Sequence, residues 1–379
     1  MNIPISKSPL FKNDSPSYKR DKGKLKSVIS KRGARSSYRV ARKIGNKSHA
    51  KGQVLLSCSR KPLSSLVKRL KIGNAEEQQK AAKRLGEMGV SASCAVLGLV
   101  KALFYPSFSV SLAARSALIK MGPGIVPEIF KAFKHKGFKG MVGWLGMNIS
   151  EIMTKMGGGV SPYCITALRS SNQNVKKVAA YVLSKVGSKS VRPLLQALND
   201  KSIYKRIAGA LGRFGPGVAT PLITRLSSAK PWVREGASIA LGLIRPKVRY
   251  AIPHLIRLAS RDRSWKVRFA TVRALGRIGA ISESALKVYI SLLNHGHYKV
   301  REMTIFTLKM IRTRDSRVFE GLMDRLRDKN GDVRAAAAFA LGFFKGRADL
   351  VRQHLKPLLN DRDTGVMLAA RSALIRLNR

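Results

Sequence analysis

One helical pattern recurs ten times between Glu77 and Asn378, and this repetition constrains the fold more than any other feature of the sequence. Successive copies start 28 to 35 residues apart. A unit of that length is too short to bury an apolar face alone, so neighbouring units are expected to stack into a solenoid. The first residue of each copy, which we call position 0, is Glu77, Val110, Leu145, Val175, Ile203, Val233, Val267, Val300, Val333 or Val366.

The repeated segment is predicted to be the second helix of a hairpin. Positions 0, 3, 4, 7, 8 and 11 are mostly apolar and lie on one face of a helix. Proline recurs in the segment before it, as at Pro127 and Pro253, and proline fits the first turn of a preceding helix. Glycine recurs after the repeated helix, where a left-handed cap is expected: Gly89, Gly122, Gly157, Gly187, Gly215 and Gly279.

These residues resemble the HEAT-like repeats, particularly the short type first named from phycobilisome lyases. The resemblance rests on the signature Val-Arg-x-x-Ala-x-x-x-Leu-Gly-x-x-Gly and on the preceding Pro-Leu-Ile-x-x-Leu, and it covers roughly residues 63–379. It implies an all-α fold, a right-handed α-solenoid of about ten helical hairpins. The first copy departs from the signature with Glu77-Gln78, and the third departs further, so an irregular stack is expected near residues 137–160.

Residues 1–62 are predicted to be a disordered basic arm. They contain few large apolar residues, so they cannot bury enough surface to offset the entropy of ordering. The acid-poor stretch 23–70 also fits an organelle transit peptide, which remains an alternative. Clusters of basic residues in the arm are candidates for contact with nucleic acid: Lys31, Arg32, Arg35, Arg39, Arg42 and Lys43.

The charge of the chain indicates a polyanionic partner. Lysine and arginine number 73 and aspartate and glutamate 20, which gives a formal charge of +53. Solubility alone requires a magnitude of about 2–8 in a small domain, and so strong a field attracts nucleic acid or another polyanion. Residues 1–72 carry +18 and the other 307 residues +35, so the repeats themselves are expected to take part.

Position 1 of the repeats is basic and allows two interpretations. Its side chains could contact phosphates, or they could pair with an aspartate five residues before the next position 0, as in Asp262, Asp328 and Asp361. HEAT-like repeats are known for such a ladder, and we favour that interpretation. The residues at position 1 are Lys176, Arg234, Arg268, Arg301 and Arg334.

Position 10 is predicted to form a basic stripe, because no acidic residue recurs beside it. Helices of neighbouring repeats pack 8–10 Å apart, so charges one repeat apart could follow a phosphate backbone. Small residues at positions 5, 6 and 9 are interpreted as helix crowding. Trp232 and Trp265 are candidates for stacking on bases. The basic residues at position 10 are Lys120, Lys155, Lys185, Arg213, Arg277 and Arg376.

We therefore expect a non-catalytic protein that binds the phosphate backbone of DNA or RNA. A scaffold for an acidic protein is the first alternative, since solenoids offer extended surfaces to partners. The second is a repair enzyme: alkylpurine DNA glycosylases built of HEAT-like repeats place an aspartate and aromatic residues around a damaged nucleotide, and Asp262 with Trp265 resembles that pattern locally. Bilin lyase activity is implied only by the name of the repeat family.

No cofactor, metal ion or membrane span is expected. No histidine is directly followed by a glutamate, the pair that the iron-dependent HEAT hydroxylases require. No phosphate loop or GxSxG motif occurs. The three cysteines, Cys58, Cys94 and Cys164, have no close spacing and are predicted to form neither a disulfide nor a metal site. Together with the lack of a signal core, this indicates an intracellular protein, cytoplasmic or associated with a nucleoid or nucleus, and not a secreted one.

Overall fold

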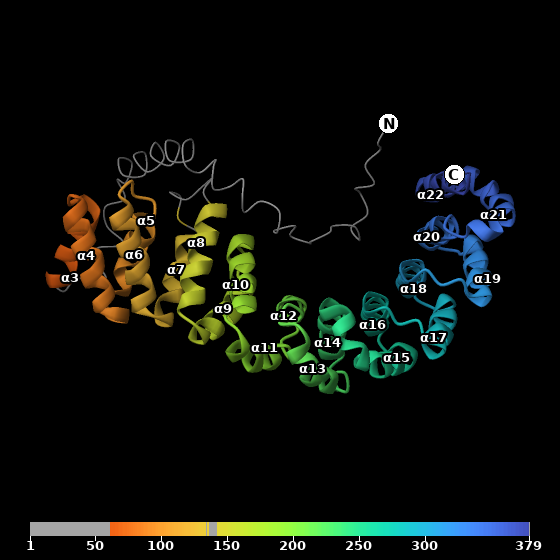
Figure 1. The fold of residues 1–379 in the computed structure, drawn as a ribbon, viewed down its shortest axis with the longest axis horizontal. Coiled ribbons are helices and arrows are strands. Elements are labelled where there is room, and N and C mark those ends of the chain that lie inside the picture. The colour runs from red at the N-terminus through yellow and green to blue at the C-terminus, as the bar shows by residue number, and fades with distance from the viewer. Residues whose placement is uncertain (1–60, 134, 136–141, 379) are drawn as a thin grey trace. The chain divides into compact units, whose positions relative to one another are not determined.

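The fold is an α-solenoid (Figure 1), described by a computed structural model over residues 61–133, 135 and 142–378. Within these residues every regular element is an α-helix or a short 3-10 helix, as the sequence predicts. Within the described residues the first helix begins at Lys61, and the sequence predicts that the solenoid starts at residue 63. The basic arm and its six candidate residues lie outside the described residues. The chain divides into two compact units, residues 1–137 and 138–379.

Unit 1 contains the first two copies of the repeat. Its helix α4 explains why the first copy lacks valine at position 0: Glu77 forms a capping box, in which its carboxylate accepts from the Asn74 N–H and its own N–H donates to the Asn74 side chain, each at 2.9 Å. The helices are α3 (Lys61–Ile72), α4 (Ala75–Glu87), α5 (Val96–Ala102), α6 (Phe108–Met121) and α7 (Val126–Ala132), with the 3-10 helices η2 (Gly89–Ala95) and η3 (Pro123–Ile125).

Unit 2 contains the other eight copies, and each forms the second helix of a hairpin. Figure 1 shows these second helices along the inner side of unit 2. The third copy, expected to be irregular, forms a continuous helix, α8, although residues 136–141 lie outside the described residues. The second helices are α8 (Val142–Lys155), α10 (Gln173–Lys185), α12 (Tyr204–Leu211), α14 (Pro231–Ile244), α16 (Trp265–Ile278), α18 (Tyr298–Ile311), α20 (Gly331–Leu341) and α22 (Thr364–Leu377).

The first helices of unit 2 lie along its outer side (Figure 1) and are shorter. Most follow a 3-10 turn that reverses the chain after the preceding second helix. They are α9 (Ser161–Ala167), α11 (Val191–Ala197), α13 (Ala219–Arg225), α15 (Ile252–Arg261), α17 (Glu283–Leu293), α19 (Ser316–Asp324) and α21 (Ala348–Leu355). The 3-10 turns that precede first helices are η5 (Gly158–Val160), η6 (Ser188–Ser190), η7 (Pro216–Val218), η8 (Arg245–Ala251) and η10 (Lys345–Arg347). Two others, η9 (Arg325–Arg327) and η11 (Pro357–Asn360), follow the first helices α19 and α21.

The turn after most second helices requires a backbone conformation with positive φ. All six glycines predicted as caps have φ between 61° and 83°. In two repeats of unit 2 an arginine occupies the same position, Arg245 with φ 66° and Arg312 with φ 52°. With ψ −144°, Arg245 lies near a region that only glycine populates readily, whereas Arg312, with ψ 41°, adopts the less costly left-handed helical conformation.

Glycine at position 9 allows successive second helices to approach closely. A Cβ atom on Gly242 of α14 would lie 2.8 Å from the Cα of Ala274 in α16, and one on Gly342 of α20 would lie 2.9 Å from the Cα of Ala373 in α22. Gly86 in unit 1 meets Ala117 in the same way. The interpretation as helix crowding is confirmed for the glycines at position 9, whereas a Cβ on Gly209 at position 6 would have no atom within 4 Å.

The cysteines differ from the prediction. Cys94 is disulfide-bonded, so the expectation that no cysteine forms a disulfide is wrong. Sequence spacing could not show this, because it does not report the distance between two thiols in the fold. Cys164 in α9 is free and buried, and burial raises the pKa of its thiol to about 12. No helix in the described part of the chain is long and apolar enough to cross a membrane.

The close approach of α14 and α16 predicts that Gly242→Ala destabilises the protein by about 1–3 kcal/mol, since the added methyl group must push the helices apart. Gly209→Ala in α12 is the matched control. No atom lies within 4 Å of its Cβ position, so the change should raise helix stability by about 0.5–1 kcal/mol. Urea unfolding followed by circular dichroism measures both, and equal stability of the two variants would contradict the close packing.

Candidate functional site

Three arginines at position 1 join successive repeats of unit 2 through paired hydrogen bonds. Each guanidinium group donates to both oxygens of an aspartate that precedes the next second helix, at 2.6–2.9 Å. These are the aspartates that the sequence pattern identified, and the inter-repeat ladder is confirmed. Its pairs are Arg234 with Asp262, Arg301 with Asp328 and Arg334 with Asp361.

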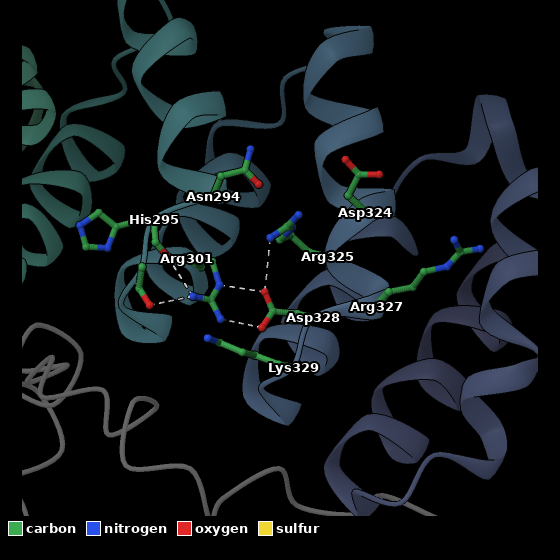
Figure 2. Close-up of a pocket in the computed structure, with 9 residues that line it drawn as sticks. Asn294, His295, Arg301, Asp324, Arg325, Arg327, Asp328 and Lys329 are labelled. Carbon is green, nitrogen blue, oxygen red and sulfur yellow. Dashed lines mark hydrogen bonds and ion pairs between the residues drawn. The ribbon is translucent and has the colours of Figure 1, made fainter.

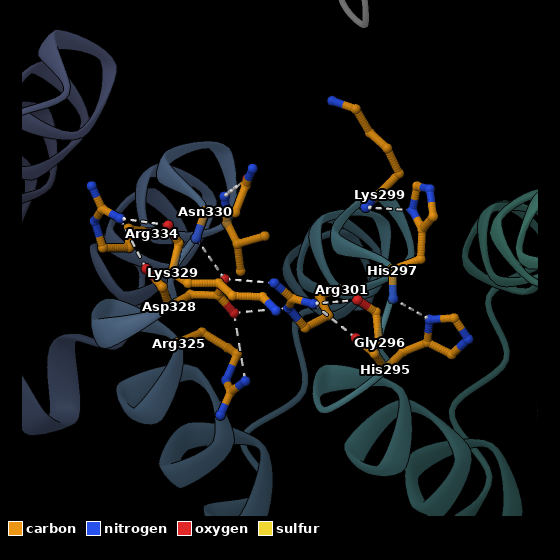
Figure 3. Close-up of polar contacts among 11 residues, drawn as sticks. His295, Gly296, His297, Lys299, Arg301, Arg325, Asp328, Lys329, Asn330 and Arg334 are labelled. Carbon is orange, nitrogen blue, oxygen red and sulfur yellow. Dashed lines mark hydrogen bonds and ion pairs between the residues drawn. The ribbon is translucent and has the colours of Figure 1, made fainter.

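In the middle pair of the ladder, Arg301 and Asp328 make hydrogen bonds beyond those to each other (Figure 3). Arg301 is 4% exposed, and its Nη1 also donates to the carbonyl oxygens of His295 and Gly296, at 2.8 and 3.2 Å. Burial acts to raise the pKa of Asp328, but hydrogen bonds from Arg301 and from the Asn330 N–H outweigh it and lower that pKa. These arginines therefore hold the solenoid together and have few donors left for a ligand.

The other two candidates at position 1 are placed differently. Arg268 donates through Nε to the backbone carbonyl of Asp262 at 2.6 Å, so it supports the ladder. Lys176 in α10 is half-buried. Position 1 is thus mainly a structural column.

Position 10 is the better candidate for a surface that binds a ligand. Arg213 and Lys185 are exposed, and the Lys185 ammonium lies 5.7 Å from the centre of the Tyr181 ring. Lys155 is exposed but paired with Glu151 at 3.3 Å. Arg277 and Arg376 are half-buried, each in a cluster described below, and Lys120 belongs to unit 1. The candidates of unit 2 share one position in the repeat and come from five of its eight copies.

Apolar residues at position 10 were missed by the sequence reasoning, which considered only the basic members. Three intervening repeats carry Leu243, Met310 and Phe343, and all three are 37–49% exposed. The sequence could have identified these apolar residues, because position 10 can be read in every repeat and not only in the basic ones. The column is therefore a mixed apolar and cationic surface.

Three arginines, which we call the arginine cluster, meet where the end of α14 lies against α16. Arg273 and Arg277 are one turn apart on α16, close to Ala274, which packs against Gly242 of α14. Arg245 directly follows α14. Burial and the charges of Arg273 and Arg245 lower the pKa of Arg277 to about 10. Within the described residues, no carboxylate forms a salt bridge with any of the three. An anion is the natural complement to this cluster.

Two phenylalanines and two cations form a second group, the aromatic cluster, across α18, α20 and α22. The Phe339 and Phe343 rings lie 5.7 Å apart, edge to face at 79°. The Lys309 Nζ lies 4.3 and 5.2 Å from their centres, and the Arg376 Cζ lies 4.7 and 4.3 Å from them. Burial lowers the pKa of both cations. Neither has a salt bridge to a carboxylate in the part of the chain that the structure describes.

The two tryptophans proposed for base stacking are already engaged. Trp232 donates through Nε1 to the carbonyl oxygen of Asn199 at 3.0 Å. Trp265 is stacked on His297, with ring centres 3.7 Å apart and an angle of 14° between the rings. One face of Trp265 is thus covered within the protein.

A cavity of about 330 Å³ lies beside the ladder, between the loop after α17 and the end of α19 (Figure 2). Arg327 and Lys329 line it together with the pair of Arg301 and Asp328. Arg325 also lines it, and its buried Nε has no hydrogen-bond partner within the described residues. The ladder pair of Arg301 and Asp328 forms part of the wall of this cavity, and both side chains are already bound to each other.

Comparison with known families matches two segments, residues 219–289 and 286–375, to the family described as HEAT repeats. Comparison with curated proteins finds no match. Among solved structures, the chain is similar to an engineered protein, with 21% identity over 84% of this chain and 99% of that one and a TM-score of 0.40.

Two natural proteins show a comparable likeness. Importin beta is 16% identical over 96% of this chain and 62% of its own, with a TM-score of 0.47. The complex of CpcE and CpcF of phycocyanin lyase from Nostoc sp. PCC7120 is 23% identical over 57% of this chain and 94% of its own, with a TM-score of 0.33. At these identities and TM-scores, the likeness carries no argument about what this chain does.

Breaking the ladder should unfold the solenoid. Asp328→Asn leaves the Arg301 charge buried without its partner, so we expect a loss of about 3–5 kcal/mol. Asp349→Asn is the control, because Asp349 is fully exposed and its loss should have no measurable effect. Since the folded pKa of Asp328 is lowered, its stabilisation is present above the ordinary pKa of about 4 and is lost as the pH falls through the folded value. Thermal unfolding from pH 7 to 2 should show this decline in the native protein, and a smaller one in Asp328→Asn.

The strained backbone at Arg245 predicts that Arg245→Gly stabilises the protein. Relief of an unfavourable φ and ψ is worth about 1–3 kcal/mol, and the greater freedom of glycine in the unfolded chain returns about 0.5–1 kcal/mol. Arg312→Gly should stabilise less, because its conformation costs less. Urea unfolding compares the two variants, and a less stable Arg245→Gly protein would show that the Arg245 side chain contributes contacts that exceed the strain.

Proposed function

We propose that the protein, whose residues 219–375 match the family described as HEAT repeats, is a non-catalytic scaffold that binds nucleic acid through its phosphate backbone. The proposal takes its architecture from the solenoid, which offers an extended surface to a partner. Nucleic acid is proposed as the ligand because many lysines and arginines of the solenoid form no salt bridge within its described residues. We propose that this binding takes place inside the cell, in the cytoplasm or with a nucleoid or nucleus, because nucleic acid is found there; the disulfide of Cys94 does not support that location.

One observation carries the proposal: most aspartates and glutamates of unit 2 already form salt bridges. Residues 138–379 hold 44 lysines and arginines and 14 aspartates and glutamates. Eleven of those 14 acids already form salt bridges, several of them in the ladder. Few carboxylates therefore remain to pair with the excess lysines and arginines. A partner with closely spaced negative charges would supply the missing anions.

A phosphate backbone suits the way these cations are arranged. Neighbouring repeats stack about 8–10 Å apart, so Lys185 and Arg213, which belong to consecutive repeats, lie at a spacing that a phosphate backbone can match. Binding to phosphates releases condensed counterions, which gives affinity without base recognition. Lys185, Arg213 and the arginine cluster are the contacts we propose first. Sequence preference is expected to be weak.

The engaged state of Asp262 and Trp265 supports the proposal that binding occurs without catalysis. Both carboxylate oxygens of Asp262 accept from Arg234, and the N–H of Ser264 donates to one of them at 2.8 Å. Trp265 is covered on one face by His297. A glycosylase needs an aspartate and an aromatic face that are open to the damaged nucleotide.

An acidic protein is the second candidate partner, and the apolar members of position 10 favour it. Leu243, Met310 and Phe343 are exposed at the position that carries the cations in other repeats, and Ile375 is exposed on α22. Apolar side chains among cations suit a protein surface that combines acidic and apolar residues. HEAT-repeat solenoids are suited to scaffolding of this kind.

The proposal predicts salt-sensitive binding of the full-length protein to nucleic acid. Fluorescence anisotropy from about 50 to 300 mM salt should give a linear log–log plot, with a slope near −0.9 for each duplex phosphate neutralised. Arg213→Gln and Lys185→Gln should each weaken binding to all sequences alike and reduce the slope by about 1. Lys80→Gln removes the same charge from a cation that is already paired with Glu76, so it should leave the slope unchanged.

Residues 61–379 provide the next comparison, since they keep the solenoid and lack most of the arm. A retained slope assigns the phosphate contacts to the repeats. Loss of binding on removal of the arm, or no binding at about 150 mM salt, contradicts the proposal for the solenoid. Competition with poly-glutamate then tests the acidic protein as the partner.

A further inference from the structure

The aromatic cluster has features that phosphate binding alone does not require. Phe343, which lies two residues after the end of α20, is 49% exposed at position 10, where six other repeats carry a lysine or arginine. Lys309 and Arg376 are each within 5.2 Å of the centres of both rings. The cluster therefore combines an open aromatic surface with two positive charges.

The cations of the cluster also lack a complete set of acceptors. The Arg376 Nη1 is buried and has no hydrogen-bond partner within the described residues, and the Arg376 Nη2 reaches only the Ser372 Oγ at 3.5 Å. Two like charges share a pair of rings, so the cluster carries an excess of positive charge that the rings offset only in part. A ligand that completes it must bring an anion and a flat apolar face together.

An unpaired nucleotide offers this combination, since its base presents a π-face and its phosphate follows a few bonds away. In a duplex the base faces are stacked on one another, and the protein meets mainly phosphates and groove edges. Proteins that bind single strands combine a cationic surface with exposed aromatic side chains for this reason. Met310 and Ile375, which are next in sequence to Lys309 and Arg376, are also exposed.

We propose that the aromatic cluster is a subsite for single-stranded nucleic acid, in which a base stacks on Phe343 and the adjacent phosphate contacts Arg376 and Lys309. The inference rests on the proposed function and names its substrate class. It assigns recognition of unpaired strands to α18, α20 and α22. The arginine cluster on α14 and α16 then serves as a phosphate contact that duplex and single strand share.

The test is fluorescence anisotropy of the full-length protein with a 20-nucleotide labelled strand and with the duplex of the same sequence, at about 150 mM salt. The single strand should bind more tightly than the duplex. Phe343→Leu keeps an apolar side chain but removes the ring, so single-strand affinity should fall roughly 5- to 150-fold, the range found for one lost base stack. Its affinity for the duplex should stay within about twofold.

Matched variants separate stacking from general effects. Phe108→Leu removes a phenylalanine that is 80% exposed in unit 1 and should change neither affinity. Phe343→Trp should keep or increase single-strand binding, because it restores an aromatic face, and it still tests the subsite if Phe343→Leu folds poorly. Arg376→Gln should weaken single-strand binding and reduce its salt slope.

The outcomes distinguish this inference from the proposed function. If both forms of nucleic acid bind with a steep salt slope and Phe343→Leu affects neither, the subsite is overturned while phosphate binding stands. Tighter binding of the duplex than of the single strand also overturns it. If neither form binds, the proposed function fails, and the subsite fails with it; capture of an acidic polypeptide that Phe343→Leu weakens would then assign the cluster to a protein partner.

Discussion

The hydrogen-bonded pairing of arginine with aspartate between repeats is the interaction on which unit 2 depends. Each pair buries two charges that would be costly alone, and the cost is met because every guanidinium also donates to backbone carbonyl oxygens of the preceding turn. The arginine thereby fixes the turn inside its own repeat and the start of the next second helix. Loss of one partner, as in the ladder of Arg301 and Asp328, leaves the other charge without compensation. This geometry explains why an aspartate stands five residues before position 0 in three of the copies.

The same pairing decides how much charge remains for a partner. Because the ladder and other salt bridges occupy most acids of unit 2, the remaining lysines and arginines repel one another unless an external anion binds. The arginine cluster shows the effect locally, since the pKa of Arg277 is lowered by burial and by two neighbouring guanidinium groups. A fold that places Arg245 in a conformation suited to glycine retains both this repulsion and backbone strain. We regard that combination as the physical basis of the proposed polyanion binding.

Several properties of the fold could be predicted because they depend on local sequence. The apolar periodicity defines the helices, the six capping glycines mark the turns, and Asp262, Asp328 and Asp361 recur at the spacing that the ladder needs. Other properties could not be predicted. Sequence spacing does not show that Cys94 forms a disulfide or that Trp265 stacks on His297, because both depend on residues brought together by packing. The aromatic cluster was missed for the same reason, since its members come from three helices.

The sequence by itself determined the repeat, its helical hairpins, the residues that join one repeat to the next and the total charge. Each of these follows from a pattern within one or two units, where the distance along the chain sets the distance in space. Only the tertiary structure decided which cations are consumed and which remain open. Arg234 and Arg213 are both basic residues of second helices, yet one is bound to Asp262 and the other is exposed. The difference arises from what the neighbouring repeat places beside each side chain.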